Sequence, residues 1–196
     1  MLSVHGLEIS RGGVPLLAGV SFAVGPGEAL VLRGPNGVGK TSLLRTLAGL
    51  QPAAGGRIEM QEGAAALAGH ADGLKGALTV AENLAFWARL HGRRETGDAM
   101  AAFGIERLAR RPAADLSAGQ RRRAGLARLI VTGRPLWLLD EPTVSLDADA
   151  VALFEAALSA HLARGGAAVL STHLPAPGLR QIDLSSCRAA VPAGWL

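Results

Sequence analysis

The sequence reads Gly34-Pro35-Asn36-Gly37-Val38-Gly39-Lys40-Thr41 directly after the apolar run Ala29-Leu30-Val31-Leu32. A continuous apolar run of this kind is typical of a strand that is buried on both faces. Beyond the glycines, leucines between positions 43 and 50 recur at helical spacing, and Pro52 marks the end of that pattern. The segment therefore reads as strand, glycine-rich loop and helix, which is the context that a phosphate-binding loop requires.

Each part of this loop suits a phosphate group. The glycines let backbone N–H groups turn inward, and the helix N-terminus adds a partial positive charge of roughly half a unit. Lys40 would reach the β- and γ-phosphate oxygens of ATP, and the Thr41 hydroxyl would hold Mg²⁺. A glycine-rich turn without a ligand is the alternative, but the loop spacing, strand and helix all favour a nucleotide. The predicted ATP-binding residues are Gly34, Pro35, Asn36, Gly37, Val38, Gly39, Lys40, Thr41 and Ser42.

A second motif supplies acidic groups. The apolar run Trp137-Leu138-Leu139 ends in Asp140 and Glu141. Asp140 would anchor Mg²⁺ through a water molecule, and Glu141 is placed to polarise the attacking water as a general base. The pair could instead cap the next turn, but two adjacent carboxylates after a buried run are costly without a cation. We therefore predict Thr41 and Asp140 at the metal, and Glu141 as the catalytic base.

Composition limits the class of protein. The chain has 196 residues, 49% of them hydrophobic and 18% charged, which fits one globular domain with or without a small insert. The apolar balance suggests a partner surface, although alanine enrichment explains it equally well. The formal net charge of +4 suits anionic ligands or an anionic membrane face. Basic residues are not interleaved with aromatic ones as a single-strand groove would require, so we expect no nucleic-acid partner.

Cysteine usage and hydropathy bear on the compartment. The sole cysteine is Cys187, which excludes an internal disulfide and a multi-thiolate metal site and agrees with a reducing compartment. The N-terminus has neither the basic start nor the apolar stretch of a secretory signal. No apolar run reaches the roughly 18 residues that span a bilayer. We expect a cytoplasmic chain that contacts membranes only through a partner.

The rest of the chain alternates strands and helices. Alternating apolar residues between positions 4 and 24, interrupted at Gly12-Gly13, indicate N-terminal strands joined by turns. Alternation of strands with helices favours an α/β fold with a mainly parallel sheet. The elements expected beyond the phosphate loop are a helical stretch over residues 80–111 broken at His91–Asp98, a strand over Pro135–Leu139, a helix over Ala148–Leu162 and a strand over Ala167–Ser171.

The segment Leu116-Ser117-Ala118-Gly119-Gln120 narrows the interpretation. It resembles the signature motif of ABC ATPases, with Ala118 in place of a glycine. The resemblance implies that Leu116 to Gln120 contact the ATP held by the other subunit, with Ser117 and Gly119 on its γ-phosphate, so that a homodimer encloses two ATP molecules. Without the family, Ser117 reads as an ordinary helix N-cap.

Membership of this family also implies an architecture. The expected fold is a P-loop NTPase with a mainly parallel, RecA-like core sheet, an N-terminal antiparallel β subdomain and a small helical insert. One domain would span residues 1–196, with the helical subdomain inserted at about residues 80–116.

Four further positions resemble family residues. Asp147, in Val144-Ser145-Leu146-Asp147, matches the D-loop and would bridge to the partner's phosphate loop. His173 matches the switch histidine that contacts the γ-phosphate, although alone it would read as a strand-end hydrogen-bonding residue. His70 stands where the family usually has the Q-loop glutamine, which gives it a catalytic and coupling role. Arg11 stands where many members stack an aromatic on adenine, and its planar guanidinium can also stack.

A wider set of residues resembles one branch of the family, the ATPase subunits of cytochrome c maturation complexes, also called haem exporters. The branch implies ATP-driven haem export or handling, permease partners of the CcmB and CcmC type, and a peripheral position on the cytoplasmic face of the bacterial inner membrane. The residues that carry this resemblance are Gly69–Lys75, Glu82-Asn83-Leu84, Arg121-Arg122-Arg123 after the signature, and Leu136–Pro142.

Other functions stay open at this point. An ABC ATPase with a different cargo fits as well, because the membrane subunits set the cargo. A soluble ABC ATPase acting on DNA or the ribosome would need a long coiled coil or a second cassette, and a non-catalytic nucleotide-binding module would not need Lys40, Asp140 and Glu141. Phe86 and Trp87 either border the partner groove beside His70 to Lys75 or fill the core of the insert.

Overall fold

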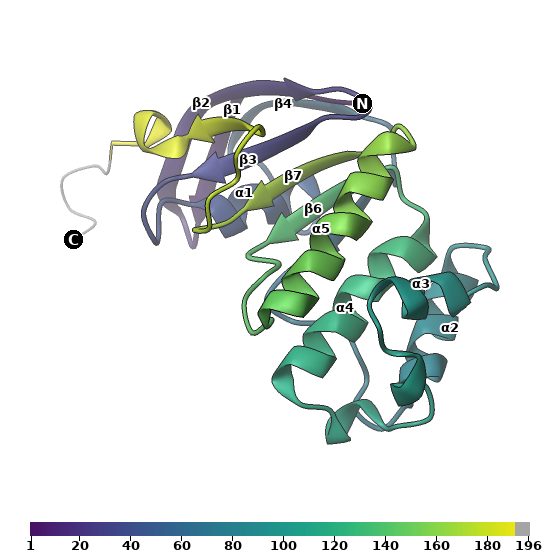
Figure 1. Cartoon of the computed structure of the whole chain (residues 1–196). Coiled ribbons are helices and arrows are strands. Elements are labelled where there is room, and N and C mark those ends of the chain that lie inside the picture. Colours follow the sequence, from purple (N-terminus) through teal and green to yellow (C-terminus); the bar gives the residue numbers. More distant parts are fainter. Residues whose placement is uncertain (191–196) are drawn as a thin grey trace.

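Two sheets form the framework of the molecule (Figure 1). The computed structural model describes residues 1–190, so the end of the expected domain, 191–196, lies outside the described residues. One sheet has three antiparallel strands in the order β2-β1-β4, and the other has five parallel strands in the order β5-β6-β7-β3-β8. The predicted fold class is thereby confirmed. The strands are β1 Leu2–Arg11, β2 Val14–Val24, β3 Ala29–Arg33, β4 Gly55–Met60, β5 Ala65–Ala68, β6 Leu136–Asp140, β7 Ala167–Ser171 and β8 Arg180–Asp183.

The helices divide into three positions (Figure 1). One helix, α1, lies between the two sheets, α5 crosses the other face of the parallel sheet, and α2, α3 and α4 gather at the far end of the molecule. Three short 3-10 turns complete the described elements. The bounds are α1 Lys40–Leu47, α2 Val80–Leu90, α3 Gly97–Ala102, α4 Ala118–Thr132 and α5 Ala148–Ala163, with turns at Glu106–Leu108, Ala113–Asp115 and Leu184–Cys187.

The three inner parallel strands, β3, β6 and β7, are buried on both faces, which explains their apolar sequences. Along β6, Leu136 and Leu138 pack toward α1 and the antiparallel sheet, whereas Trp137 and Leu139 pack toward α4 and α5. Strands β3 and β7 alternate in the same way. Because successive side chains of a strand point to opposite faces, each strand joins two cores and fixes α1 and α5 on opposite sides of one sheet.

Short elements account for the differences from the sequence prediction. Strands β4, β5 and β8 were not predicted, because they are edge strands with few β-branched residues, such as the alanine-rich β5. The apolar spacing that continued through Phe103 to Leu108 does not form one helix. Helix α3 ends at Ala102, and Leu108 belongs to a 3-10 turn. Helical periodicity alone does not distinguish these structures.

Helices α2, α3 and α4 form the helical part of the molecule. It is stabilised by a capped first turn of α2 and by the buried side-chain amide of Asn83. Thr79 and Glu82 form a reciprocal capping box at the start of α2. Asn83, which is buried, accepts a hydrogen bond from the backbone N–H of Lys75 and donates to the carbonyls of Lys75, Leu78 and Thr79. Asn83 therefore fixes the loop before α2 to the helix.

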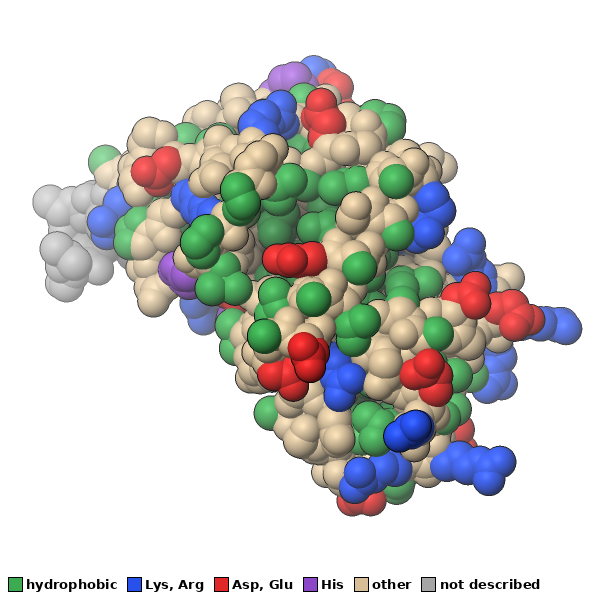
Figure 2. All heavy atoms as spheres, viewed as in Figure 1, with side chains coloured by type: hydrophobic (Ala, Val, Ile, Leu, Met, Phe, Trp, Pro, Cys, Tyr) green, Lys and Arg blue, Asp and Glu red, His purple; other side chains and the backbone are tan. Residues whose placement is uncertain are grey.

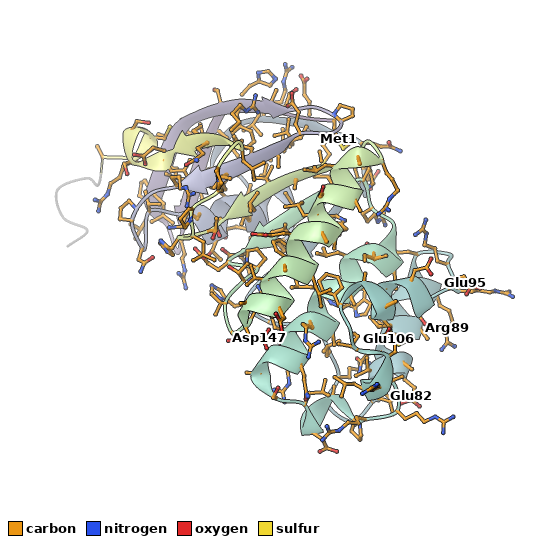
Figure 3. All side chains as sticks on the ribbon, viewed as in Figure 1. Met1, Glu82, Arg89, Glu95, Glu106 and Asp147 are labelled. Atoms are coloured by element: carbon orange, nitrogen blue, oxygen red, sulfur yellow. The ribbon has the colours of Figure 1, made fainter. Side chains whose placement is uncertain are left out.

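The outer surface of this part is strongly charged. Figure 2 shows Lys, Arg, Asp and Glu side chains crowded over the end formed by α3 and α4, while apolar side chains lie beside α5. In Figure 3, Glu82 and Arg89 lie on this outer end, and Asp147 lies where α5 begins. Among the described residues, no helix is both long enough and apolar enough to cross a bilayer.

A stacked pair of rings, Trp137 and His161, connects the parallel sheet to α5. Their centroids are 3.9 Å apart with an interplanar angle of 10°. The Nε2 atom of His161 lies 3.2 Å from the carbonyl oxygen of Ala167. Burial lowers the pKa of His161 below its ordinary value of 6.5, and the hydrogen bonds to the carbonyls of Ala167 and Pro135 only partly oppose this. The imidazole is therefore held neutral in the folded protein.

Proton binding to His161 should make stability depend on pH. Because its pKa is lower in the folded state, the unfolded state binds the proton first as the pH falls. The stabilisation is full above the unfolded-state value and is lost as the pH falls through the folded-state pKa. We expect the thermal midpoint of His161→Phe to depend less on pH than that of the parent between about pH 7 and about pH 5. Ser159→Ala, on the exposed face of α5, changes no titratable group, serves as control and should keep the parental pH dependence. Identical slopes for His161→Phe and the parent would contradict this role.

Candidate functional site

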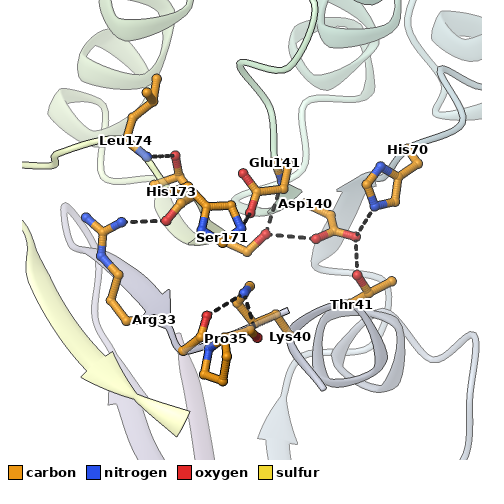
Figure 4. A network of polar contacts seen from close by, with 12 residues as sticks. Arg33, Pro35, Lys40, Thr41, His70, Asp140, Glu141, Ser171, His173 and Leu174 are labelled. Carbon is orange, nitrogen blue, oxygen red and sulfur yellow. Dashed lines mark hydrogen bonds and ion pairs between the residues drawn. The ribbon is translucent and has the colours of Figure 1, made fainter. Parts of the chain in front are cut away.

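The phosphate loop lies between the end of β3 and the start of α1, at the carboxyl edge of the parallel sheet (Figure 4). Its glycines adopt backbone angles that favour glycine, with φ of 132° at Gly34 and 119° at Gly39. A Cβ atom at Gly39 would lie only 3.1 Å from the Leu17 side chain on β2. The loop is thus bounded by the antiparallel sheet on one side.

Lys40 is the first residue of α1, and its ammonium group lies against the loop. The Nζ atom donates hydrogen bonds to the carbonyl oxygens of Gly34 at 2.7 Å and Pro35 at 3.2 Å. Only 8% of the residue is exposed. Its positive charge is consequently held at the concave side of the loop, where a phosphate would bind.

Asp140 ends β6 and is the centre of the acidic cluster (Figure 4). Its Oδ2 atom accepts a hydrogen bond from Thr41 Oγ1 at 2.7 Å, and its Oδ1 atom accepts one from Ser171 Oγ at 2.8 Å. The Nε2 atom of His70 lies 3.6 Å from Oδ2. Three segments far apart in sequence, α1, the end of β7 and the loop after β5, therefore meet at one carboxylate.

Glu141 follows in a backbone conformation that is unusual for a side chain, with φ of 47°. Its N–H donates to Ser171 Oγ at 3.0 Å, which fixes the turn to the end of β7. The Oε1 atom is buried and accepts no hydrogen bond, although His173 Nε2 lies 3.3 Å away. A buried carboxylate oxygen without a donor is suited to accept a proton from water.

These residues surround one pocket of about 420 Å³. Arg11, at the end of β1, lies on its rim and is exposed. The structure therefore places Arg11, His70 and His173 together with the phosphate loop and the two carboxylates. The residues that line this pocket are Arg11, Leu16, Asn36, Gly37, Gly39, Lys40, Thr41, Ser42, His70, Asp140, Glu141 and His173.

The segment Leu116–Gln120 lies elsewhere and does not line this pocket. Ser117 caps α4 in a reciprocal box, accepting from the N–H of Gln120 at 3.2 Å while its own N–H donates to the Gln120 side chain. Gly119 lies so close to the carbonyl of Ser145 that a Cβ atom would be 2.9 Å from it. Ser117 is exposed, and its expected contact with nucleotide bound by a second subunit stays a prediction.

Asp147 has a local role that is evident from its contacts. Its Oδ1 atom accepts a hydrogen bond from the N–H of Ala150 at 2.8 Å and so caps α5. The residue is exposed and does not line the pocket around Lys40. Its predicted contact with a partner stays a prediction.

Three residues of the site were not identified from the sequence. Ser171 bonds Asp140 directly, Arg33 donates to the carbonyl of Thr172 beside His173, and Arg122 bonds the carbonyl of Glu141. A serine that ends a buried strand next to the strand of Asp140 could have indicated the first. The other two act on backbone carbonyls, for which the sequence contains no pattern.

The donor set around Asp140 fits Mg²⁺. This ion prefers oxygen ligands and is usually bound by one or two carboxylates together with substrate phosphates and water. The Thr41 hydroxyl and the Asp140 carboxylate supply two adjacent oxygens beside the phosphate loop. No cluster of three or more His, Cys, Asp or Glu side chains that could bind a metal occurs in residues 1–190. Thr41 and Asp140 would thus supply the protein oxygens, and phosphate oxygens and water would supply the further ligands of the ion.

A groove of about 590 Å³ lies beside the site, between α1 and the helical part. His70, Ala71 and Gly73 line it together with Trp87, whose Nε1 atom donates to the carbonyl of Gly73 at 3.1 Å. Trp87 also packs against the core. It therefore both lines this groove and fills part of the core of the helical part. Phe86 is 44% exposed and borders a separate hollow on the outer face of α2.

Comparison of the sequence with known proteins identifies the family of this chain. The family described as "ABC transporter" matches residues 17–144. The chain is 59% identical to the cytochrome c biogenesis ATP-binding export protein CcmA of Paracoccus denitrificans, over 97% of this chain and 91% of that protein. It is 60% identical to the protein of the same name from Ruegeria pomeroyi, over 88% and 85%.

Solved structures agree with the fold. The chain superposes on cbiO1 of Clostridium perfringens, described as part of the ABC transporter complex cbiONQ, with a TM-score of 0.72 and 25% identity over 88% of this chain and 78% of that one. The family match includes the phosphate loop, the signature segment and both carboxylates, and the identity to the two relatives extends over most of the chain. The chain therefore belongs to the ATP-binding subunits of ABC transporters and, within that family, to the CcmA group.

Proposed function

We propose that this chain is the ATPase subunit of an ABC transporter complex and that closure of its homodimer on ATP drives haem export or handling for cytochrome c biogenesis. One observation carries the proposal. Lys40, Thr41, Asp140 and Glu141 surround a single pocket in a chain that is 59% identical to a cytochrome c biogenesis ATP-binding export protein.

In this proposal, hydrolysis depends on positioning and electrostatics. Lys40 and the loop N–H groups bind the phosphates, and Arg11 stacks on adenine. Mg²⁺, held by Thr41 and through water by Asp140, would neutralise charge on the phosphate oxygens. Glu141 orients and deprotonates the attacking water, for which its unpartnered Oε1 is suited.

His173 and His70 complete the proposed catalytic group. His173 Nε2 lies 3.3 Å from Glu141 Oε1 and lines the pocket around Lys40, where it would contact the γ-phosphate. His70 Nε2 lies 3.6 Å from Asp140 Oδ2 and can hydrogen-bond the water of the metal. We propose that His70 replaces the glutamine usual in the family as the link between the site and the membrane subunits.

Each site would be completed by a second copy of the chain. Ser117 and Ala118 are exposed at the N-terminus of α4, and a helix N-terminus of this kind suits an anion. Asp147 lies near the same surface and would contact the phosphate loop of the partner. This arrangement follows the two-fold symmetry in which the same patch of each subunit faces the other.

The membrane partners in this proposal are permease subunits of the CcmB and CcmC type, contacted from the cytoplasmic face of the bacterial inner membrane. The groove of about 590 Å³ supports this because apolar residues of α1 and the following loop line it, including Leu50, which is 60% exposed. An apolar groove beside the catalytic site suits a helix of a partner.

Replacement of Glu141 by Gln tests the base. The variant keeps the shape of the side chain but cannot accept the proton, so we expect ATP to bind normally and hydrolysis to fall by about 10²–10⁴-fold. Purified complexes provide the measurement, through phosphate release and nucleotide affinity. Glu155→Gln, on the exposed face of α5, is the matched control and should hydrolyse ATP at the parental rate. Undiminished hydrolysis by Glu141→Gln would exclude this role.

Complementation between two inactive variants tests the shared site. Lys40→Ala removes the phosphate contact, and Ser117→Arg blocks the signature segment, so each homodimer should be inactive. If Ser117 acts on the partner's ATP, a mixed dimer has one intact site, and an equal mixture recovers about a quarter of the parental activity. A mixture as inactive as its components would indicate that Ser117 acts within its own chain.

Purification of the tagged chain from membranes tests the partners. We expect cytochrome c maturation permease subunits in the eluate, identified by mass spectrometry. Leu50→Asp should reduce their recovery, because a charge would enter the groove, whereas Leu90→Asp, on the outer face of α2 and 62% exposed, should not. Recovery of permeases unrelated to cytochrome c assembly would overturn the assignment of the cargo.

A further inference from the structure

Arg122, on the first half of α4, is a buried cation at the junction of three segments. Only 6% of the residue is exposed. A buried guanidinium is costly unless its donors are satisfied and its charge is paired. Arg122 meets both conditions, because every nitrogen of its guanidinium donates a hydrogen bond and Nη1 lies 3.2 Å from Asp72 Oδ1.

One side of the guanidinium holds the turn that carries the catalytic base. Its Nη2 atom donates to the carbonyl oxygens of Asp140 at 3.2 Å and Glu141 at 2.9 Å, and its Nε atom donates to that of Pro142 at 3.1 Å. Three successive carbonyls are thus bound by one side chain. The φ of 47° at Glu141 is unfavourable for a residue with a Cβ, so this conformation needs external support.

The other side holds the loop that contains His70. Its Nη1 atom donates to the carbonyl of Gly69 at 2.6 Å and to Asp72 Oδ1. The loop also lies directly on α4, because a Cβ atom at Gly125 would be 2.8 Å from the Asp72 side chain and 3.1 Å from its backbone. We call residues 69–73 the bridging loop. It lines the apolar groove and reaches the catalytic pocket through His70.

We propose that Arg122 is a positioning residue for ATP hydrolysis, which fixes the Glu141 turn to the bridging loop and to the signature helix α4. A displacement of the bridging loop or of α4 then changes the position of Glu141 through a single rigid, planar group. This inference rests on the proposed ATPase function. It adds a mechanical link between the apolar groove, the signature helix α4 and the proposed base Glu141.

The neighbouring Arg123, in contrast, makes its hydrogen bonds within the helical part. Its Nη1 atom donates at 3.1 Å to the carbonyls of Phe103 and Gly104, both within the helical part. It makes no contact with the Glu141 turn or the bridging loop among its hydrogen bonds in residues 1–190. Arg123→Lys is therefore a matched control for Arg122→Lys, with the same helix, the same chemical change and the same kind of acceptor.

The experiment compares these variants in the purified transporter complex. Lysine keeps the charge but has one ammonium group in place of a planar fork, so it cannot bond both sides at once. We expect Arg122→Lys to lower kcat by about 10–100-fold, the loss typical of a small misplacement of a catalytic group. The dissociation constant of ATP should stay within about twofold, because Arg122 does not touch the phosphate loop. Arg123→Lys should keep both values.

A second variant tests the link to the bridging loop and does not depend on how Arg122→Lys folds. Asp72→Asn keeps an acceptor oxygen and removes the charge, so we expect a smaller fall in kcat at unchanged ATP affinity. If the two residues act as one unit, the double variant should lose no more kcat than Arg122→Lys alone.

Three results would overturn the inference. The first is a parental kcat for Arg122→Lys. The second is a parallel loss of kcat, ATP affinity and thermal midpoint in both Arg122→Lys and Arg123→Lys. The third is full additivity of the effects of the Arg122 and Asp72 changes on kcat. Failure of the proposed function is recognised separately, because the parent complex itself would then hydrolyse no ATP.

Discussion

Hydrogen bonding of the buried Asp140 carboxylate is the interaction on which the rest of the structure depends. Asp140 is 3% exposed, at the end of a central strand, and is held by hydroxyl groups from α1 and β7. A buried carboxylate is stable only if its oxygens are hydrogen-bonded or paired with a cation. The order β6-β7-β3 brings Ser171 and the phosphate loop to the same edge, because parallel strands end together. The contacts that stabilise the buried carboxylate are therefore the same contacts that bring the residues of the site together.

The strands with continuous apolar sequences were predictable because burial on both faces leaves a clear pattern. The phosphate loop, Asp140 and Glu141 were predictable for a related reason, since their chemistry needs particular residue types at fixed spacing after such strands. Strands β4, β5 and β8 were not, because edge pairing is decided by the neighbouring strand rather than by the composition of the segment. The helical stretch up to Leu108 was misjudged because apolar spacing does not distinguish a helix from successive 3-10 turns.

Contacts to backbone carbonyls were the larger omission within the site. Arg33 and Arg122 donate to backbone carbonyls, which every residue possesses, so the sequence has no partner to search for. His70 and His173 lie beside the carboxylates, and the sequence pointed to them only through resemblance to the family, so their roles stay predictions. Their positions in space depend on loops whose course is set by tertiary packing, such as the close approach of Asp72 to Gly125.

The capping box at Ser117 has a consequence for how this surface can change in evolution. The hydroxyl oxygen accepts from the N–H of Gln120, and a hydroxyl group that accepts a hydrogen bond can still donate its own hydrogen. Aspartate could also cap α4, but an ionised aspartate has no hydrogen to donate to a neighbouring anion. Helix stability alone would therefore accept aspartate at position 117, whereas binding of an anion at this surface would exclude it.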